Sequence, residues 1–427
     1  MLTSGIIVYM PNRQETGFPK KFLWGVSSSA HQVEGAQSNQ WTVWELENAK
    51  ALAAQAPYHY DDLESWARYD KQASEPSNYV SDKAANHYEL YERDLELVRK
   101  MNMNTFRLSV EWSRIQPQKD AWDVAEVEHY KSVLAACKER GIEPIVTLFH
   151  FTLPVWFVEM GGFEKSANGR LFVDYAARIL EELGMGVKYV ITMNEPETYV
   201  RHGYLEGLWP PQVMNKRLSK TVLANLAKAH NQIADTLHAA SRRYKVSIAK
   251  NYSYIYPGDD AWLTVRAASY KHRQHNESFL NKVIKTCDFI GINYYLSERV
   301  YGYRVHNPDV RINDVGWDMQ PQYLARVLEE LHEKYDKPIF ITENGLADGT
   351  DADRTWWLTQ TMLALQAAIK KGVPVIGYLY SNLTDGFEWE KGKWPQFGLF
   401  AVNPKTMERV PRPSALWLAK TLKKLRG

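Results

Sequence analysis

Short apolar runs alternate with segments of helical period along almost the whole chain. Eight runs of four to eight residues are rich in β-branched and aromatic side chains, a composition typical of buried strands. Between them lie longer segments with apolar residues at helical spacing, such as 88–98 and 223–240. The eight runs, in chain order, cover residues 22–26, 105–110, 144–149, 189–193, 246–249, 289–294, 338–342 and 373–380.

This alternation predicts an α/β fold. Eight strands that alternate with helices in a chain of uniform composition favour a single (β/α)8 TIM barrel, spanning residues 1–427 as one domain. An open doubly wound sheet is the alternative, but the chain has no glycine-rich dinucleotide turn. Two connections, residues 36–83 and 296–321, are much longer than ordinary βα loops, and we expect them to build a substrate site on the catalytic face.

Composition narrows the class of protein and of partner. The 427 residues are 45% hydrophobic and 24% charged, with a formal net charge of +2, which is typical of a soluble globular protein. Basic residues form neither a stripe for nucleic acid nor a polybasic membrane patch, so we expect a small neutral partner. The apolar stretch 5–10 is too short for a signal peptide or a membrane span and lacks a basic leader, which favours a cytoplasmic location.

The sequence indicates neither a metal nor a cofactor. Its two cysteines, Cys137 and Cys287, are too few for a disulfide framework, and we expect both to be buried free thiols. Cysteine and histidine do not cluster at metal-ligand spacing, and no glycine-rich phosphate loop occurs.

Two glutamates stand at the ends of apolar, β-rich runs. Glu195 lies in the string TMNEP (192–196) and Glu343 in the string TENG (342–345). The C-terminal ends of barrel strands carry the chemistry of this fold class, and a pair of carboxylates there is the usual equipment for cleaving a glycosidic bond. Glu195 precedes Pro196 and could mark only a helix boundary, but acidic residues seldom lie buried at strand ends without a task.

Further polar side chains end the neighbouring strands. Taken alone, His150 is more simply a core histidine with a hydrogen-bond partner. Because the carboxyl ends of barrel strands meet at one rim, residues from seven strands together predict one site. The candidates are Gln32, Arg107, His150, Asn194, Glu195, Asn293, Tyr295, Glu343, Glu388 and Trp389.

Several longer motifs occur in the order typical of one enzyme family. On these motifs the chain resembles family 1 of the glycoside hydrolases, the β-glucosidase and β-galactosidase family, from end to end. The motifs are FLWGVSSSAHQVEG (22–35), FRLSVEWSRI (106–115), DFIGINYY (288–295), NLTDGFEW (382–389) and FGL (397–399), together with the two glutamate strings.

The resemblance implies roles for the candidate residues. Glu343 would be the nucleophile, kept ionised by Arg107 and Tyr295. Glu195 would protonate the leaving oxygen and then, as a base, activate water. Asn194 would hold the sugar 2-hydroxyl, and Trp317 resembles a platform for the aglycone. The residues expected to bind substrate are Gln32, His150, Asn194, Asn293, Trp317, Glu388 and Trp389.

Two positions depart from the family pattern. The His-Trp pair that the family has after its third strand is His150-Phe151 here, so an indole N–H donor is missing. An alignment without gaps places Ser381 where the family has a tryptophan floor under the first sugar. Both changes fall in the sugar subsite, and the preferred sugar therefore stays open among glucose, galactose, fucose and mannose.

The sequence predicts a retaining β-glycosidase, in the first place a β-glucosidase, that acts on small β-glycosides or oligosaccharides. A 6-phospho-β-glycosidase is an alternative within the same family, disfavoured because Glu388 would repel a phosphate. A sugar-binding protein without catalysis is a second alternative, but it would be expected to lack one of the two glutamates, and both are present.

Overall fold

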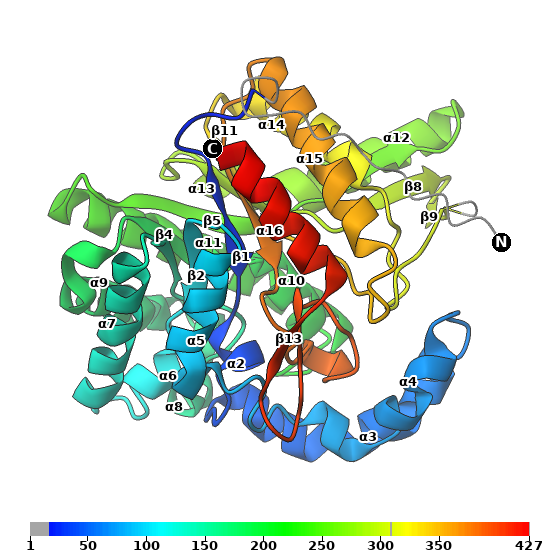
Figure 1. Cartoon of the computed structure of the whole chain (residues 1–427). Coiled ribbons are helices and arrows are strands. Elements are labelled where there is room, and N and C mark those ends of the chain that lie inside the picture. Colours follow the sequence, from blue (N-terminus) through cyan, green and yellow to red (C-terminus); the bar gives the residue numbers. More distant parts are fainter. Residues whose placement is uncertain (1–16, 308–309, 427) are drawn as a thin grey trace.

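Eight parallel strands close into a barrel at the centre of the molecule (Figure 1). The computed structural model describes residues 17–307 and 310–426. Around the barrel the strands follow the order β1-β11-β10-β7-β5-β4-β3-β2, and β1 pairs with both β11 and β2 to close it. The barrel strands are β1 (Leu23–Ser27), β2 (Thr105–Ser109), β3 (Glu143–Thr147), β4 (Tyr189–Asn194), β5 (Lys245–Asn251), β7 (Ile290–Asn293), β10 (Ile339–Asn344) and β11 (Val375–Ser381). The predicted (β/α)8 barrel is thereby confirmed.

The barrel interior is filled by apolar side chains of its own strands. Ile145, Ile191, Phe340 and Leu379, each from a different strand, belong to one small buried cluster. A much larger cluster joins the outward faces of the strands to the surrounding helices. Because both faces of the strands are buried, each strand reads as a continuous apolar run, which is why all eight were visible in the sequence.

Helices form the outer layer around the barrel (Figure 1). The α-helices are α2 (Ala30–Val33), α3 (Gln40–Tyr60), α4 (Trp66–Ala73), α5 (His87–Lys100), α6 (Trp112–Ile115), α7 (Val124–Glu139), α8 (Val155–Glu159), α9 (Gly169–Leu183), α10 (Pro196–Val200), α11 (Lys216–Ala240), α12 (Trp262–His272), α13 (Leu280–Val283), α14 (Leu324–Tyr335), α15 (Arg354–Lys370) and α16 (Pro413–Arg426). Short single-turn elements are η1 (Pro76–Tyr79), η2 (Gly162–Glu164), η3 (Ser166–Asn168), η4 (Gly184–Gly186), η5 (Arg201–Glu206), η6 (Arg273–Glu277), η7 (Pro321–Tyr323) and η8 (Trp389–Lys391).

The connection 36–83, which we expected to be a long loop, is mostly helical. Asn39 caps α3, because its side chain accepts from two backbone amides while Thr42 bonds back to the cap residue. Trp41, Ala49 and Ala53 are buried along one side of α3. An amide cap followed by an alanine-rich segment is a readable helix signal, and the expectation of a plain loop was wrong. In Figure 1, α3 and α4 lie at the edge of the molecule, away from the central strands.

The connection 296–321 also carries regular structure. It contributes β8 (Ser297–Tyr301) and β9 (Arg304–Val305), which form a small sheet with β6 (Tyr254–Pro257). A second small sheet pairs β12 (Phe400–Val402) with β13 (Arg409–Pro411). These additions brace the loops at the carboxyl ends of the strands.

Two further expectations concern the cysteines and the lack of a membrane-spanning segment. Cys137 and Cys287 are both free and buried, as predicted. Within residues 17–307 and 310–426, no helix has the length and apolar character needed to span a membrane.

Candidate active site

Glu343 is held by two side chains at the rim of the barrel. It lies on β10, and its Oε1 accepts a hydrogen bond of 2.6 Å from Nη1 of Arg107, a buried side chain of β2. The hydroxyl of Tyr295 donates to Oε2 over 2.8 Å. A fully buried guanidinium and a phenol thus bind one carboxylate, as the sequence predicted for Arg107 and Tyr295.

The pKa of Glu343 reflects a balance of opposing effects. Burial raises this pKa from its ordinary value to about 7, the charge of Arg107 lowers it, and the negative charge of Glu195 raises it. The hydrogen bond from Tyr295 lowers it further. Burial therefore outweighs the stabilisation of the ionised form by Arg107 and Tyr295.

Glu195 is held by a different set of neighbours. It caps α10 in a left-handed conformation with φ of 39°, and Pro196 follows it. Its Oε1 accepts from Nδ2 of Asn293 over 2.7 Å. Its Oε2 accepts from Thr198 over 2.8 Å and from Nδ2 of Asn251 over 2.9 Å. Hydroxyl and amide donors surround Glu195, in contrast to the guanidinium and phenol at Glu343.

Asn194 connects the surroundings of the two glutamates. Its Oδ1 accepts from Nη2 of Arg107 over 2.8 Å and from Nδ2 of Asn293 over 3.1 Å. Because Oδ1 is occupied by two donors, the amide orientation is determined and Nδ2 must donate. It points to Nε2 of His150 at 3.0 Å. Arg107, Asn194, Asn293 and both glutamates therefore form one continuous hydrogen-bond network.

His150 is consequently assigned one tautomer. Since its Nε2 accepts from Asn194, the ring hydrogen is placed on Nδ1. Nδ1 has no hydrogen-bond partner among the described residues. Burial and the nearby charge of Arg107 hold the pKa of His150 well below its usual range, so the ring is neutral. A buried N–H donor without a partner in the wall of a cavity is suited to a ligand hydroxyl.

Gln32 and Glu388 meet on the opposite side of the same cavity. Nε2 of Gln32 donates to Oε2 of Glu388 over 3.1 Å, and Oε1 of Gln32 accepts from Ser29. Burial raises the pKa of Glu388 to about 8, with Lys391 opposing the shift and Glu390 adding to it. At neutral pH this carboxyl is mainly protonated and can both donate and accept hydrogen bonds.

These side chains surround one cavity of about 300 Å³. Arg107 and Asn293 lie beneath its surface, where both are fully buried and hold the lining residues. Trp317 lines the outer part, with its ring 5.6 Å from Tyr295 and 5.7 Å from Phe397. The predicted site residues that line the cavity are Gln32, His150, Asn194, Glu195, Tyr295, Trp317, Glu343, Glu388 and Trp389, and Phe151 and Ser381 line it as well.

Two glutamates and several hydrogen-bonding side chains thus line one cavity, and comparison with known proteins shows the family to which such a chain belongs. The model of glycosyl hydrolase family 1 matches residues 14–286 and 276–426. The chain belongs to glycosyl hydrolase family 1. It is therefore a glycoside hydrolase, and the family resemblance stated from the motifs is confirmed.

Relatives of this family 1 hydrolase are named for different activities. "Galactolipid galactosyltransferase SFR2, chloroplastic" of Arabidopsis thaliana is 30% identical over 334 residues, covering 73% of this chain and 53% of that protein, so the chain spans about half of its length. "Beta-glucosidase A" of Thermotoga maritima is 26% identical over 455 residues, covering 95% of this chain and 98% of that protein. The solved structure of a beta-glycosidase from Pyrococcus horikoshii is similar with a TM-score of 0.83 at 32% identity, covering 97% of this chain and 96% of that one.

Sequence reasoning missed several residues of the family 1 site. Asn251 ends β5, and its position as the last residue of a strand was the signal available. Thr198 stands one helical turn after Glu195. Other cavity residues come from connections with no strand-end signal; they are Arg201, His202, Trp209, Leu296, Glu390, Lys391 and Phe397.

Proposed function

We propose that this hydrolase is a retaining β-glycosidase of the β-glucosidase type, which removes the terminal non-reducing sugar from small β-glycosides or oligosaccharides. The proposal rests above all on the unequal surroundings of its two glutamates. Glu343 is bound by a buried cation and a phenol that favour its ionised form, whereas Glu195 is bound by neutral amides and a hydroxyl. One carboxylate is thereby suited to attack and the other to exchange a proton.

The reaction would proceed in two displacements. In the first, a carboxylate oxygen of Glu343 forms a bond to the anomeric carbon while Glu195 gives its proton to the glycosidic oxygen, and the aglycone leaves as an alcohol. In the second, Glu195 removes a proton from water, the oxygen of that water bonds to the anomeric carbon, and Glu343 is released as a carboxylate. Two inversions give a β-configured product.

We propose that the remaining side chains hold the sugar. The Nδ1–H of His150 and the Gln32–Glu388 pair would bind outer hydroxyls, since all three line the cavity and His150 keeps an unused donor. Asn194 lies between Arg107 and His150, next to both glutamates, where it would bind the 2-hydroxyl. Trp389 would contact the sugar and Trp317 the aglycone, since both line the cavity.

The 6-phospho-β-glycosidase alternative is not favoured by the surroundings of Glu388. Lys391 lines the same cavity and could in principle attract a phosphate, but its ammonium group is paired with Glu390. Glu388 is mainly protonated at neutral pH, so the repulsion of a phosphate expected from the sequence develops only as the pH rises through about 8. Arg201, which also lines the cavity, is paired with Glu206, so the described lining residues offer no unpaired Lys or Arg for a phosphate.

Hydrolysis of a panel of chromogenic β-glycosides tests the proposal. The panel contains glucoside, galactoside, fucoside and mannoside, each compared with glucoside 6-phosphate, and NMR follows the first product. We expect the glucoside to be cleaved fastest with the β-anomer released first. Release of the α-anomer would contradict the retaining mechanism, preference for the phosphorylated substrate would favour the alternative, and no hydrolysis alongside glucose binding would indicate a sugar-binding protein.

A further inference from the structure

Two aromatic residues in the cavity wall have a backbone conformation that bulky side chains rarely adopt. Phe151 has φ of 69° and Trp389 has φ of 48°, both in the left-handed region. Their rings contact each other with centroids 4.9 Å apart. Conformations of this kind persist only where surrounding contacts enforce them, so the neighbours of Phe151 and Trp389 identify what shapes this wall.

The ring of Trp389 contacts two histidines. Its ring stacks on His31 with centroids 5.6 Å apart at 9°, and on His150 with centroids 5.9 Å apart at 19°. His150 lines the cavity, whereas His31 does not and is 1% exposed. His31 therefore packs against Trp389 from outside the cavity, and a bound substrate could not contact it.

The plane of the His31 ring is determined by hydrogen bonds at both nitrogens. Asn39 uses its Oδ1 to accept from the backbone amides of Trp41 and Thr42, so its Nδ2 is the group that faces Nδ1 of His31 at 3.2 Å. Nδ1 thus accepts, and the hydrogen on Nε2 is donated to Oε1 of Glu45 over 2.6 Å. Neither nitrogen is free to let the ring turn.

Glu45 is itself fixed from its other side. Its Oε2 accepts from the backbone amide of Ser81 over 2.7 Å and from the Ser81 hydroxyl over 2.8 Å. Glu45 lies on α3 and is fully buried. A buried carboxylate with three donors is a rigid anchor, and it joins the helix of the long insertion to the ring that supports Trp389.

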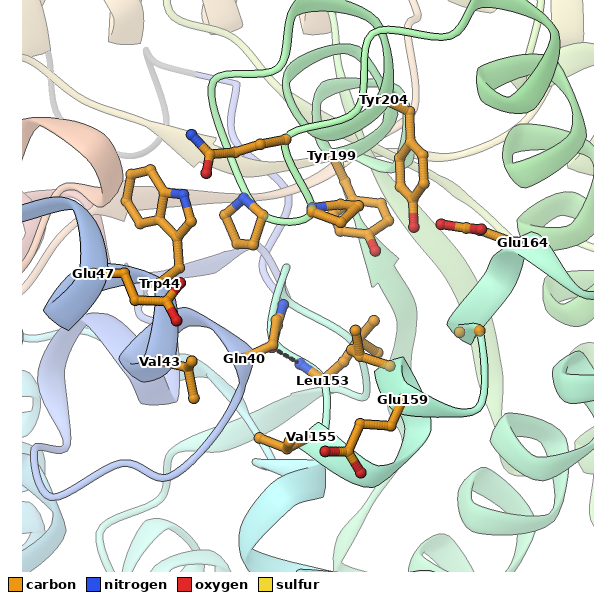
Figure 2. Close-up of a pocket in the computed structure, with 16 residues that line it drawn as sticks. Gln40, Val43, Trp44, Glu47, Leu153, Val155, Glu159, Glu164, Tyr199 and Tyr204 are labelled. Atoms are coloured by element: carbon orange, nitrogen blue, oxygen red, sulfur yellow. Dashed lines mark hydrogen bonds between the residues drawn. The ribbon is translucent and has the colours of Figure 1, made fainter.

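The same helix also holds the second strained residue. Nε2 of Gln40, at the start of α3, donates to the carbonyl oxygen of Phe151 over 2.7 Å. The backbone amide of Leu153 donates to Oε1 of Gln40, as the dashed line in Figure 2 shows, and the backbone amide of Gln40 donates to the carbonyl oxygen of Leu153 over 3.1 Å. Gln40 and Leu153 also line a separate pocket of about 250 Å³.

We infer that His31 and Glu45 are positioning residues that fix where the Trp389 side chain lies in the cavity wall, with helix α3 as their support. This inference rests on the proposed function, because it takes Trp389 as a sugar contact. A support of this kind acts equally on bound substrate and on the transition state, so its loss should raise KM and leave kcat nearly unchanged.

Conservative variants test the two residues. His31→Gln keeps a donor toward Glu45 and removes the stacked ring, whereas Glu45→Gln keeps the ring and cannot accept from both His31 and Ser81. Each should raise KM for the glucoside and the inhibition constant of glucose about 5- to 10-fold, with kcat within about twofold. Ser81→Ala, which removes one of three donors to Glu45, should produce a smaller change in the same direction.

His87→Gln is the matched control. Nδ1 of His87 contacts Oδ2 of Asp94 over 2.8 Å in a buried histidine–carboxylate pair away from the cavity. We expect His87→Gln to lower Tm about as much as His31→Gln does, but to leave KM for the glucoside unchanged. Equal kinetic effects in His87→Gln and His31→Gln, or an unchanged KM in folded His31→Gln and Ser81→Ala, would overturn the inference. If the wild-type protein hydrolyses no glycoside, the proposed function fails, whereas calorimetric glucose binding by the same variants still decides whether these residues position Trp389.

Discussion

Nδ2 of Asn251 donates a hydrogen bond of 2.9 Å to Oε2 of Glu195. Asn251 is the last residue of β5, and Glu195 follows β4 directly, so two adjacent strands bring these groups together. The amide also contacts the Thr198 hydroxyl, which donates to the same carboxylate oxygen. Both donors orient the carboxyl group that is proposed to exchange a proton with the substrate.

Asn251→Ala should therefore impair proton transfer. We expect kcat/KM for an alkyl glucoside, a poor leaving group that needs protonation, to fall about tenfold. The fall for a dinitrophenyl glucoside should be much smaller. Asn225→Ala, which removes a bond to the Phe163 carbonyl away from the cavity, is the control. An equal loss on both substrates would contradict orientation of the acid by Asn251.

Variants of the two glutamates should behave differently. Glu343→Gly is expected to lose nearly all hydrolysis, because the group that attacks the anomeric carbon is gone. Glu195→Ala should retain activity on substrates with good leaving groups and gain rate with azide, giving a β-glycosyl azide. The products are identified by NMR. If azide accelerated only the Glu343 variant and left Glu195→Ala unchanged, the assignment of Glu195 would have to be abandoned.

The acidic limb of the pH profile should follow Glu343. Burial raises the pKa of this group to about 7, and attack requires its ionised form, so kcat/KM should fall as the pH decreases through about 7. Tyr295 lowers that pKa by donating a hydrogen bond. Removing the donor in Tyr295→Phe should move the acidic limb to higher pH. A limb that stays in place or moves to lower pH would show that another group controls it.

Glu388 should make the stability of the protein depend on pH. Its pKa is raised to about 8 by burial, so the folded protein holds a proton there that the unfolded chain releases above its ordinary value of 4.5. The contribution is fully present below that value and is lost as the pH rises toward 8. The Tm of Glu388→Gln relative to wild type should therefore increase between pH 5 and pH 8.5. A constant or decreasing difference would contradict the raised pKa.

Restoring the two missing tryptophans should tighten sugar binding. Phe151 and Ser381 both line the cavity, and neither Tyr380 nor Trp394 takes the place of an aromatic floor there. We expect Phe151→Trp and Ser381→Trp to lower the inhibition constant of glucose about fivefold each and about thirtyfold together, since a neutral hydrogen bond and an aromatic contact each contribute on the order of 1 kcal/mol. Unchanged glucose affinity in all three variants would show that these positions do not contact the sugar.

The eight strands were readable because a barrel strand buried on both faces cannot vary much in polarity. The predicted and observed ends agree within two residues. Strand ends in turn placed the candidate residues on one rim. Glu45 and His31 could not be found in this way, because α3 and α2 contact the site only through the tertiary fold, and nothing in the local pattern relates His31 to a residue 14 positions later.

The raised pKa of Glu343 was equally invisible in the sequence. The motif predicted a group kept ionised by Arg107 and Tyr295, and both contacts are present. The extent of burial, which opposes them, depends on how completely the surrounding loops close over the carboxyl group. Composition and spacing carry no information on that closure.

The residues that hold the two glutamates are largely separate from the residues that depart from the family pattern. Arg107 of β2, Asn251 of β5 and Asn293 of β7 donate to the two carboxyl groups. Gln32, Phe151, Ser381 and Trp389, in contrast, follow or end β1, β3 and β11. Substitutions on these three strand ends can alter which sugar is accepted while the reacting groups stay where they are. Selection for new substrates can therefore act on these strand ends without passing through inactive forms.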